Sequence, residues 1–469
     1  MAEMQNTYEY RDPGFRQGHP DALRASKGVA PDWRCAHAGS CLNTALALGP
    51  ESIVIVVGHG ADEVKASFAP AVSTSRIPIN WVNQDRQLGT GHAVAQTIDF
   101  LKAQTTLVLY GDVPLITPTT LSRLIRAGQA GHGMALLTAQ LPDPRGYGRI
   151  VREPKQANGA IQAIIEDKDA SQEIRSICEI NTGILLAPTP ALVRWLSALE
   201  NNNAQGEFYL TDIVEMAYKE GLAIASTQPD DLHEILGINN QAQRAQLERY
   251  YQLRLGQTLM DSGVRIIDPS RLDIRGSLLC DQDVSIDIDC IFEGAVTIEN
   301  GATIGPYCVI RNSRIGRGAH IEAFSHIDGA DIGQQATVGP YARLRPGTSL
   351  GEGAHVGNFV EIKNSQLGAR SKANHLSYLG DATIGSRVNV GAGTITCNYD
   401  GAEKHRTVIE DDAFIGSDTQ LVAPVTVGRG ATLGAGTTLT HDAPADELTL
   451  SRSQQVTIKG YKRPHKKAH

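Results

Sequence analysis

The sequence is poor in aromatic residues and has no long apolar run. Phe, Trp and Tyr make up 5% of the 469 residues, which argues against an aromatic-rich β-sandwich. No stretch approaches the ~20 apolar residues of a membrane-spanning helix. The N-terminus has no apolar segment of the kind found in secretory signals. These absences predict a cytoplasmic protein.

Basic residues and paired cysteines are also scarce. Lys and Arg number 43 against 51 Asp and Glu, which gives a net charge of −8. A net acidic chain argues against broad binding to nucleic acid or anionic lipid. The seven cysteines form no Cys-x-x-Cys pair and no zinc-like spacing. We expect reduced thiols in a cytoplasmic protein.

Glycine is abundant, and the C-terminal half contains an internal repeat. The chain has 47 glycines, about 10% where roughly 7% is usual. Aliphatic residues recur every six positions from Ile286 to Val390 and again from Ile415 to Leu439, and a glycine often follows. Such a short fixed period predicts a β-solenoid in which three hexads close one triangular coil. We expect it to run from about Ile266 to Leu439.

The hexad series breaks once, between Val390 and Ile415. The break contains a polar segment, Thr396–Gly401, followed by the charged Glu403, Lys404 and His405. Insertions in a solenoid become loops on one face, often the binding face.

The N-terminal half has a different pattern, in which strands alternate with helices. Ser52–Gly58 and Thr105–Tyr110 are apolar runs typical of buried parallel strands, and residues 120–128 and 190–200 have helical patterns. This alternation predicts an α/β sheet of parallel strands. Residues 240–262 read as a long polar helix that joins the two halves.

Some residues of the N-terminal half suit nucleotide chemistry. The Gly-punctuated stretch from Gln87 to Ala93 opens a helix, where it could hold a phosphate or form a plain turn. Asp112 follows a buried strand, where a carboxylate suits Mg²⁺ beside phosphates or a helix N-cap.

Polar residues in the solenoid are informative because the repeat favours aliphatic ones. His375 could be a general base near neutral pH or a surface histidine. Arg343, Arg345 and Lys363 lie about one coil apart and form a cationic patch suited to a phosphate. The basic tail, Lys459–His469, reads as a solvated tail or a contact to an acidic cofactor.

The segment 1–41 lacks the strand with which a parallel α/β domain usually begins. Its aliphatic residues are only Leu23 and Val29, and no Gly-x-Gly turn occurs there. We therefore expect an unfilled slot at the centre of the sheet. We also expect no phosphate-binding loop in this stretch.

From about residue 42 to its end, the chain resembles a known enzyme family. The family that it resembles is the bacterial bifunctional N-acetylglucosamine-1-phosphate uridylyltransferase / glucosamine-1-phosphate acetyltransferase. The motifs that carry the resemblance are Gln87-Leu88-Gly89-Thr90-Gly91-His92, Tyr110-Gly111-Asp112-Val113-Pro114-Leu115, Gly146-Tyr147-Gly148-Arg149-Ile150, Asn201-Asn202-Asn203-Ala204-Gln205-Gly206-Glu207 and Thr394-Ile395-Thr396-Cys397-Asn398-Tyr399-Asp400-Gly401.

The resemblance implies a fold and a domain division. Residues 1–239 would form an α/β nucleotidyltransferase (Rossmann-like) domain, with residues 1–41 anomalous. Residues 240–262 would be a helical linker. Residues 263–469 would form a left-handed parallel β-helix of hexapeptide repeats with a basic C-terminal tail.

The resemblance also implies two consecutive steps toward UDP-N-acetylglucosamine, a precursor of peptidoglycan and lipopolysaccharide. An acetyl group would pass from acetyl-CoA to glucosamine-1-phosphate, and a uridylyl group would then pass from UTP, releasing pyrophosphate. The implied cofactor is Mg²⁺, and the implied assembly is a homotrimer. Residues 12–41 depart from the family and resemble its sequence read in a shifted frame, so the alternative is an acetyltransferase alone.

Site residues follow from the resemblance position by position. His375 matches the proton acceptor of acetyl transfer. Sugar-phosphate contacts match Arg345, Lys363, Tyr378 and Asn389, and acetyl-CoA contacts match Ala392, Asn398, Tyr399, Ser417, Ala435 and Arg452. UTP and UDP-sugar contacts match Gln84, Gly89, Thr90, Tyr110, Gly111, Asp112, Gly148, Glu166, Asn181 and Asn239. The Mg²⁺ ligands match Asp112 and Asn239.

Overall fold

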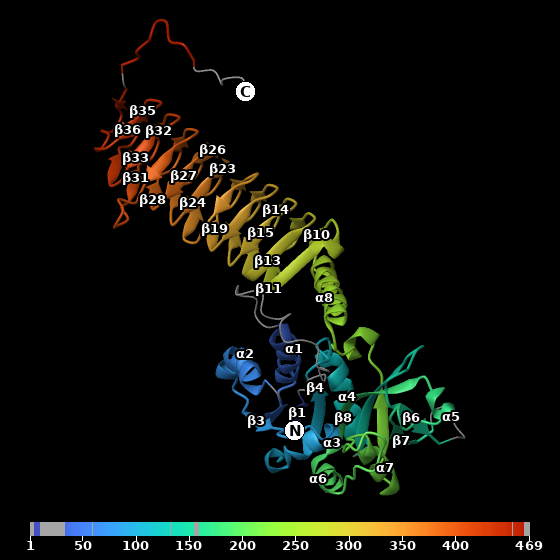
Figure 1. Cartoon of the computed structure of the whole chain (residues 1–469). Helices are drawn as coiled ribbons and strands as arrows, with labels where there is room; N and C mark the ends of the chain where they lie inside the picture. Colours follow the sequence, from blue (N-terminus) through green and yellow to red (C-terminus); the bar gives the residue numbers. More distant parts are fainter. Residues whose placement is uncertain are drawn as a thin grey trace, which may run out of the picture. The chain divides into compact units, whose positions relative to one another are not determined.

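The chain forms two compact units, Met1–Glu248 and Arg249–His469. The structure is a computed structural model that describes residues 4–9, 33–58, 60–131, 133–153, 159–452 and 454–463. The first unit is built around a mixed sheet and the second is a solenoid of stacked coils (Figure 1). Within these described residues, no helix is long and apolar enough to cross a membrane.

The sheet of the first unit has the strand order β3-β2-β1-β4-β8-β5-β9, and β6 and β7 form a hairpin beside β8. Two of its strands, β2 and β4, coincide with the apolar runs that predicted them. The strands are β1 (Met4–Glu9), β2 (Ser52–Val57), β3 (Ile79–Asn83), β4 (Thr105–Tyr110), β5 (Met134–Gln140), β6 (Arg149–Arg152), β7 (Ile161–Ile165), β8 (Glu179–Pro188) and β9 (Ile224–Thr227).

Helices cover both faces of this sheet. Leu107 and Leu109 of β4 join one apolar cluster with Leu121, and Val108 joins a second cluster with Leu192. Alternate residues of a strand point to opposite faces, so β4 is buried on both sides. The helices are α1 (Trp33–Ala47), α2 (Ala61–Thr74), α3 (Thr90–Ala95), α4 (Pro118–Ala130), α5 (Gln172–Arg175), α6 (Thr189–Ser197) and α7 (Asp212–Lys219), with short 3₁₀ turns η2 (Ile98–Phe100) and η3 (Leu232–Ile235).

The predicted central slot of the sheet is filled, which corrects the expectation drawn from segment 1–41. Strand β1 lies between β2 and β4 and pairs in parallel with both. Backbone pairing needs N–H and C=O groups but not aliphatic side chains, so a segment without Ile, Leu or Val can occupy the position. The expected lack of a phosphate loop concerns residues 10–32, which lie outside the described residues.

The alternation of strands and helices predicted a parallel sheet. The sheet is in fact mixed, and that prediction is wrong for some of its strands. Strand β8 runs antiparallel to both β4 and β5, and the hairpin β6–β7 is antiparallel. An apolar run does not encode strand direction, because a buried strand reads alike in either sense.

The second unit is the predicted β-solenoid, with successive coils paired in parallel. Its buried core contains the whole predicted hexad series, from Ile286 to Leu439. Ile304 pairs with Ile321, and Ile321 pairs with Val338. Three hexads therefore make one coil, and these coils are one residue shorter than three full hexads. The strands are β10 (Arg265–Ile266), β11 (Leu272–Cys280), β12 (Ser285–Ile286), β13 (Cys290–Ile298), β14 (Thr303–Ile304), β15 (Val309–Arg311), β16 (Arg314–Ile315), β17 (His320–Ile321), β18 (His326–Asp328), β19 (Ala330–Ile332), β20 (Thr337–Val338), β21 (Arg343–Leu344), β22 (Thr348–Leu350), β23 (His355–Asn358), β24 (Glu361–Lys363), β25 (Gln366–Leu367), β26 (Lys372–His375), β27 (Tyr378–Gly380), β28 (Ala382–Ile384), β29 (Asn389–Val390), β30 (Ile395–Cys397), β31 (Thr407–Ile409), β32 (Phe414–Ile415), β33 (Gln420–Val422), β34 (Val425–Val427), β35 (Thr432–Leu433), β36 (Thr438–Leu439) and β37 (Leu448–Thr449).

The break in the hexad series is an insertion and not a gap in the core. Thr396 and Ile409 are both buried at the positions where the repeat expects apolar residues. The Thr396 hydroxyl accepts a hydrogen bond from the Gly380 amide at 2.7 Å, which satisfies this polar side chain inside the coil. The extra residues, 398–406, leave the coil between β30 and β31; we call them the insertion loop.

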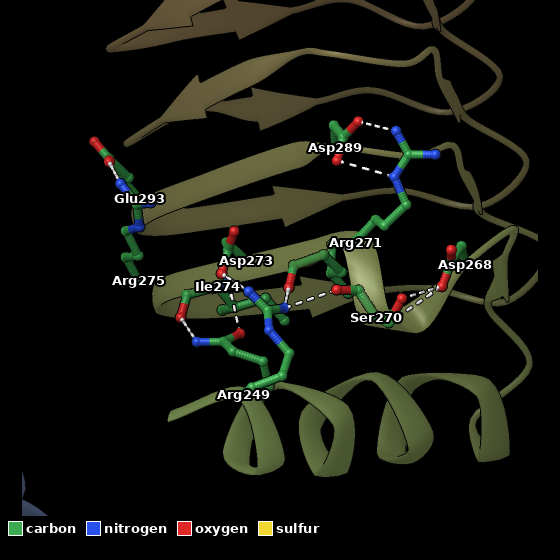
Figure 2. A network of polar contacts seen from close by, with 11 residues as sticks. Arg249, Asp268, Ser270, Arg271, Asp273, Ile274, Arg275, Asp289 and Glu293 are labelled. Carbon is green, nitrogen blue, oxygen red and sulfur yellow. Dashed lines mark hydrogen bonds and ion pairs between the residues drawn. The ribbon is translucent and has the colours of Figure 1, made fainter. Parts of the chain in front are cut away.

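The solenoid begins against the long helix α8 (Gln241–Asp261), which was predicted for residues 240–262. Gln252 is 1% exposed. Its side-chain amide donates to the Ile274 carbonyl at 2.9 Å and accepts from the Ile274 N–H at 2.8 Å. Figure 2 shows Arg249 reaching from α8 to Asp273 in the same coil. These contacts satisfy the backbone of an outer strand, which would otherwise present unpaired groups.

Candidate functional site

The candidate acetyl-transfer site follows one corner of the solenoid. Ala373 pairs with Val390, Val390 with Ile415, Ile415 with Leu433 and Leu433 with Thr449. Two residues beyond these core positions, the chain places side chains in a single line along successive coils. We call this line the corner column; its members are His375, Ala392, Ser417, Ala435 and Ser451, with Arg452 next in sequence.

Backbone hydrogen bonds tie the corner column together. The carbonyl of His375 accepts from the amide of Gly393 at 3.4 Å, and that of Ala392 accepts from Asp418 at 2.7 Å. The carbonyl of Ser417 accepts from Gly436 at 2.8 Å. His375, Ser417 and Ala435 are exposed, so a ligand can lie along the column.

The imidazole of His375 has a hydrogen-bond partner in the preceding coil. Its Nδ1 lies 2.9 Å from Oδ1 of Asn358, and the two residues pair in register. An amide oxygen accepts a hydrogen bond, which assigns the proton to Nδ1. Nε2 then carries the lone pair, as a general base requires.

The predicted sugar-phosphate residues lie on the face that follows this corner. Leu344 pairs with Ile362, which puts Arg345 and Lys363 at neighbouring positions. Arg345 and Arg343 both contact Glu361, at 2.9 and 3.5 Å. The ring of Tyr378 folds over Gly380, where an added Cβ would stand 2.4 Å from its hydroxyl. Asn389 lies on the preceding face, paired with Lys372.

The insertion loop begins at two predicted acetyl-CoA contacts, Asn398 and Tyr399. Tyr399 pairs with Lys404 as a small antiparallel bridge, and the His405 amide donates to the Asn398 carbonyl at 2.8 Å. His405 Nε2 lies 2.6 Å from Asp400 Oδ2. Backbone N–H donors and His405 hold the pKa of Asp400 far below its usual range.

The far end of the corner column opens into a pocket of about 500 Å³. It is lined by Ala435, Gly436, Thr438, Ser451 and Arg452. Two predicted acetyl-CoA contacts, Ala435 and Arg452, thus share one pocket, and Arg452 supplies a positive charge at its wall.

In the first unit, the predicted metal ligands lie at the end of β4. The carbonyl of Asp112 accepts from the Ile238 amide at 3.0 Å, which brings the residue before Asn239 beside Asp112. Gly237 leaves room there, because an added Cβ would stand 3.3 Å from Asp112 Oδ2. Among the described residues, no group of three or more His, Cys, Asp or Glu is placed to hold a metal ion.

The Gly-punctuated stretch forms the start of α3. Gln84 donates through Nε2 to the Gly89 carbonyl at 3.1 Å. Gly89 has φ 107°, and a Cβ there would stand 2.7 Å from the Phe208 carbonyl oxygen, so only glycine fits. Thr90 accepts from the Leu210 amide at 3.2 Å through its hydroxyl. Three of the predicted nucleotide contacts are therefore close together.

The remaining predicted sugar contacts gather around the β6–β7 hairpin. The backbone N–H of Asn181 donates to the Gly148 carbonyl at 2.8 Å. A Cβ on Gly148 would lie 3.5 Å from the Glu166 carboxylate. The fully buried Arg149 pairs with Asp167 at 2.9 Å, and these two residues directly follow Gly148 and Glu166. The ion pair thus fixes both strands of the hairpin.

Tyr110 and Gly111 connect this group to Asp112. An added Cβ on Gly183 would stand 2.4 Å from Tyr110 Cε2, so the tyrosine ring packs directly on the β8 backbone. Gly183 follows Asn181 by two residues, and its amide donates to the Asn181 side chain at 3.1 Å. Tyr110 therefore links the Asp112 end of the candidate nucleotide-sugar site to the end formed by Asn181 and the β6–β7 hairpin.

An acidic pocket of about 290 Å³ lies beside Glu166. It is lined among others by Asp169, Tyr209 and Asp212. Burial, together with the negative charges of Glu166, Glu215 and Asp169, raises the pKa of Asp212 to about 6. Thr211 donates to Glu166 at 3.0 Å and orients that carboxylate.

Comparison with known proteins agrees with both units. The sequence model of the MobA-like NTP transferase domain matches residues 26–181. Those of the GMPPB C-terminal domain and of the bacterial transferase hexapeptide (six repeats) match residues 274–352 and 406–441. A "Bifunctional protein GlmU" from Cupriavidus pinatubonensis is 57% identical over 452 residues, covering 96% of this chain and 96% of that protein. The chain belongs to the GlmU family.

Other members of the GlmU family give the same result. Relatives from Bordetella parapertussis and Ralstonia nicotianae are 56% and 58% identical, cover 91% of this chain, and are themselves covered to 92% and 91%. The chain is therefore a bifunctional enzyme with a nucleotidyltransferase half and a hexapeptide acetyltransferase half. The alternative of an acetyltransferase alone is not favoured, because the NTP transferase domain is present and β1 completes its sheet.

Sequence reasoning missed three residues that contact the predicted residues of the candidate acetyl-transfer site: Asn358, Glu361 and Asp381. Asn358 stands one coil before His375, so the period alone could have paired them. Asp381 precedes Asn398 by the same interval. Each looks like an ordinary corner residue until the coil repeat is used to place its partner.

Proposed function

We propose that the corner column binds acetyl-CoA in an extended form, with the thioester at His375 and the nucleotide end at Arg452. The observation that carries this proposal is the alignment of His375, Ala392, Ser417 and Ala435 along one corner. Neighbouring strands lie about 4.8 Å apart, so the four steps from His375 to Ser451, the neighbour of Arg452, span about 19 Å. A linear pantetheine arm suits such a track, and the Arg452 guanidinium suits phosphates.

The chemistry assigned to this site is acetyl transfer to the amine of glucosamine-1-phosphate. Arg345, Lys363, Tyr378 and Asn389 would hold the sugar phosphate. The neutral amine attacks the thioester carbonyl, a C–N bond forms and the C–S bond breaks. His375 Nε2 takes the proton from the amine and can pass it to the departing thiolate. Asn358 keeps the imidazole in the form that accepts this proton.

The test is His375→Ala, measured by release of free CoA from acetyl-CoA. We expect kcat to fall by roughly 10²–10⁴, the usual contribution of a positioned base, with little change in acetyl-CoA binding. His320→Ala is the matched control, because His320 is an exposed solenoid histidine bonded to Thr303. Near-normal turnover in the His375 variant would contradict the assignment.

For uridylyl transfer, we propose that Gln84, Gly89, Thr90, Tyr110, Gly111, Gly148, Glu166 and Asn181 hold the nucleotide and sugar. Asp112 and Asn239 would hold Mg²⁺. A carboxylate and an amide oxygen fit this hard cation, which commonly binds through one or two carboxylates and substrate phosphates. Mg²⁺ would neutralise charge on the phosphates during attack by the sugar phosphate on UTP.

Asp112→Asn tests the metal assignment through pyrophosphate release. We expect the activity to fall at least tenfold and the Mg²⁺ concentration for half-maximal rate to rise. Acetyl transfer by the same variant is the internal control and should not change. An unchanged Mg²⁺ requirement would remove Asp112 from the metal site.

The assembly that we propose is a homotrimer of solenoids. Tyr307, Phe324, Tyr341 and Phe359 stack with centroids 4.8–5.5 Å apart along one corner and are exposed in the chain alone. Leu376, beside His375, is 63% exposed and extends the row. An exposed apolar row of this length favours a protein contact, here a second copy that meets the edge of the active site. In sedimentation experiments, the wild-type protein should behave as a trimer. Phe359→Asp places a charge in the aromatic row and should give smaller species.

We also propose the domain division and the compartment. Residues 1–239 would carry out uridylyl transfer and residues 263–469 acetyl transfer, and residues 240–262 would form the linker. The substrates of both reactions would come from the cytoplasm. The six cysteines that the structure describes are free thiols, which suits a reducing compartment.

A further inference from the structure

Asp381 lies between the residues assigned to the two acetyl-transfer substrates. It is 7% exposed. Its Oδ1 accepts from Asn364 Nδ2 at 2.6 Å, and its Oδ2 accepts a short hydrogen bond from Asn398 Nδ2. Its amide donates to the Lys363 carbonyl at 3.0 Å, and its carbonyl accepts from the Thr407 amide at 3.2 Å.

These four bonds make Asp381 the anchor of the insertion loop. Asn398 is the first residue of that loop, and Thr407 is the first residue after it. Lys363, in the coil below, belongs to the sugar-phosphate group. The side chain, the N–H and the C=O of this one residue thus fix both ends of the loop relative to the sugar-phosphate residues.

The charge of Asp381 is held in place by its surroundings. Burial alone would raise the pKa of this carboxyl. Hydrogen bonds from Asn364 and Asn398, with the positive charges of Lys363 and Lys404, outweigh burial and hold the pKa below its usual value. Lys363 belongs to the sugar-phosphate residues and Lys404 to the insertion loop, so both groups contribute positive charge at this carboxylate.

We propose that Asp381 is a positioning residue that sets the distance between the bound sugar phosphate and the acetyl-CoA loop. It fixes the Asn398 amide with its NH₂ group toward Asp381, and this orients the amide oxygen. It also ties the two ends of the insertion loop to the backbone of Lys363, so both substrates would meet a preformed site. This inference rests on the function proposed above, which assigns Lys363 and Asn398 to the two substrates.

Asp381→Asn is a clean test because the backbone tolerates asparagine at this corner. Asp381 has φ 49°, and the same corner of earlier coils carries Asn312 and Asn364 at φ 43° and 46°. Asp and Asn both adopt this left-handed conformation readily. The variant removes the charge and one of two acceptors, so either Asn364 or Asn398 must give up its bond.

We expect the KM for both substrates of acetyl transfer to rise together and each kcat/KM to fall about tenfold or more, as for loss of a hydrogen bond to a charged group. We also expect trypsin to cleave after Lys404 or Arg406 about tenfold faster, because cleavage tracks how often the loop opens. The matched control is Asp283→Asn, another positive-φ corner aspartate that accepts from an asparagine, Asn300, at 3.4 Å.

The two measurements separate the possible results. Unchanged KM values and cleavage rate in Asp381→Asn would overturn the proposal, as would a lower melting temperature with unchanged KM values. Equal effects in Asp283→Asn would show a general response of the solenoid and would also overturn it. If wild type transfers no acetyl group, the proposed function fails, and the cleavage rate alone still decides whether Asp381 anchors the loop.

Discussion

Removing the side chain of Asn358 should slow acetyl transfer without weakening substrate binding. Asn358 is not among the residues proposed to contact a substrate; its Oδ1 lies 2.9 Å from His375 Nδ1. In Asn358→Ala the imidazole loses the acceptor that keeps its proton on Nδ1. The base would then be present in the right form for only part of the time.

The magnitude follows from the charge that develops on His375. As the imidazole takes a proton, its bond to Asn358 becomes a bond from a charged donor, worth about 1.5–3 kcal/mol. At about 1.4 kcal/mol per factor of ten, this predicts a 10- to 150-fold lower kcat. His375 is exposed and Asn358 half-buried, so water can replace part of the bond. We therefore expect a value near the lower end, about tenfold.

The assay is CoA release at saturating acetyl-CoA, with kcat and KM determined from pH 5.5 to 9. Asn358→Asp keeps an acceptor for Nδ1 and should restore most of the rate at neutral pH. Its carboxylate favours the protonated imidazole, so the acid side of its rate profile should move to higher pH. A kcat within twofold of wild type in Asn358→Ala, or a loss found only in KM, would refute the reasoning.

Three other outcomes follow from the structure. Gln252→Ala leaves the N–H and C=O of Ile274 buried and unpaired, so denaturant unfolding of the solenoid should lose about 2–4 kcal/mol, and a loss under about 0.5 kcal/mol would contradict this. Burial above all raises the pKa of Asp212 from 3.8 to about 6, so the folded state favours its protonated form and stability falls as pH rises from about 4 to 6. Because Asp212 is half-exposed, Asp212→Asn should gain only about 1 kcal/mol at pH 8 and nothing below pH 4 in thermal melts. At pH 8, iodoacetamide should label the exposed Cys178 before Cys290, whose pKa burial raises to about 12, as peptide mass mapping would show.

The solenoid core was predictable from sequence because its period is local. Each inward position recurs at the hexad spacing, so Ile321 or Leu344 can be placed without knowing any distant contact. The polar corners were not predictable in this way. Asn358 and Asp381 act on partners one coil away, and in sequence each reads as a turn residue. Their partners His375 and Asn398 are found only when the coil repeat is carried one coil further along the chain.

The α/β unit was less predictable because its sheet depends on pairing across the chain. The runs that form β2 and β4 were readable, since burial on both faces demands apolar residues. The direction of β8 was not, because it depends on pairing with β4. Strand β1 was missed because its backbone occupies the central position with few aliphatic residues to announce it.

The corner column makes the coil a unit of length. Each coil between His375 and Arg452 adds one step of about 4.8 Å, so the number of coils would set the length of the acetyl-CoA arm that we propose lies along them. Deleting one whole coil would preserve the parallel register and the apolar core, yet it would bring the guanidinium one step closer to the imidazole. A fold that tolerates such a deletion would then fit only a shorter acyl carrier. Selection on carrier length would therefore act on whole coils and not on single side chains.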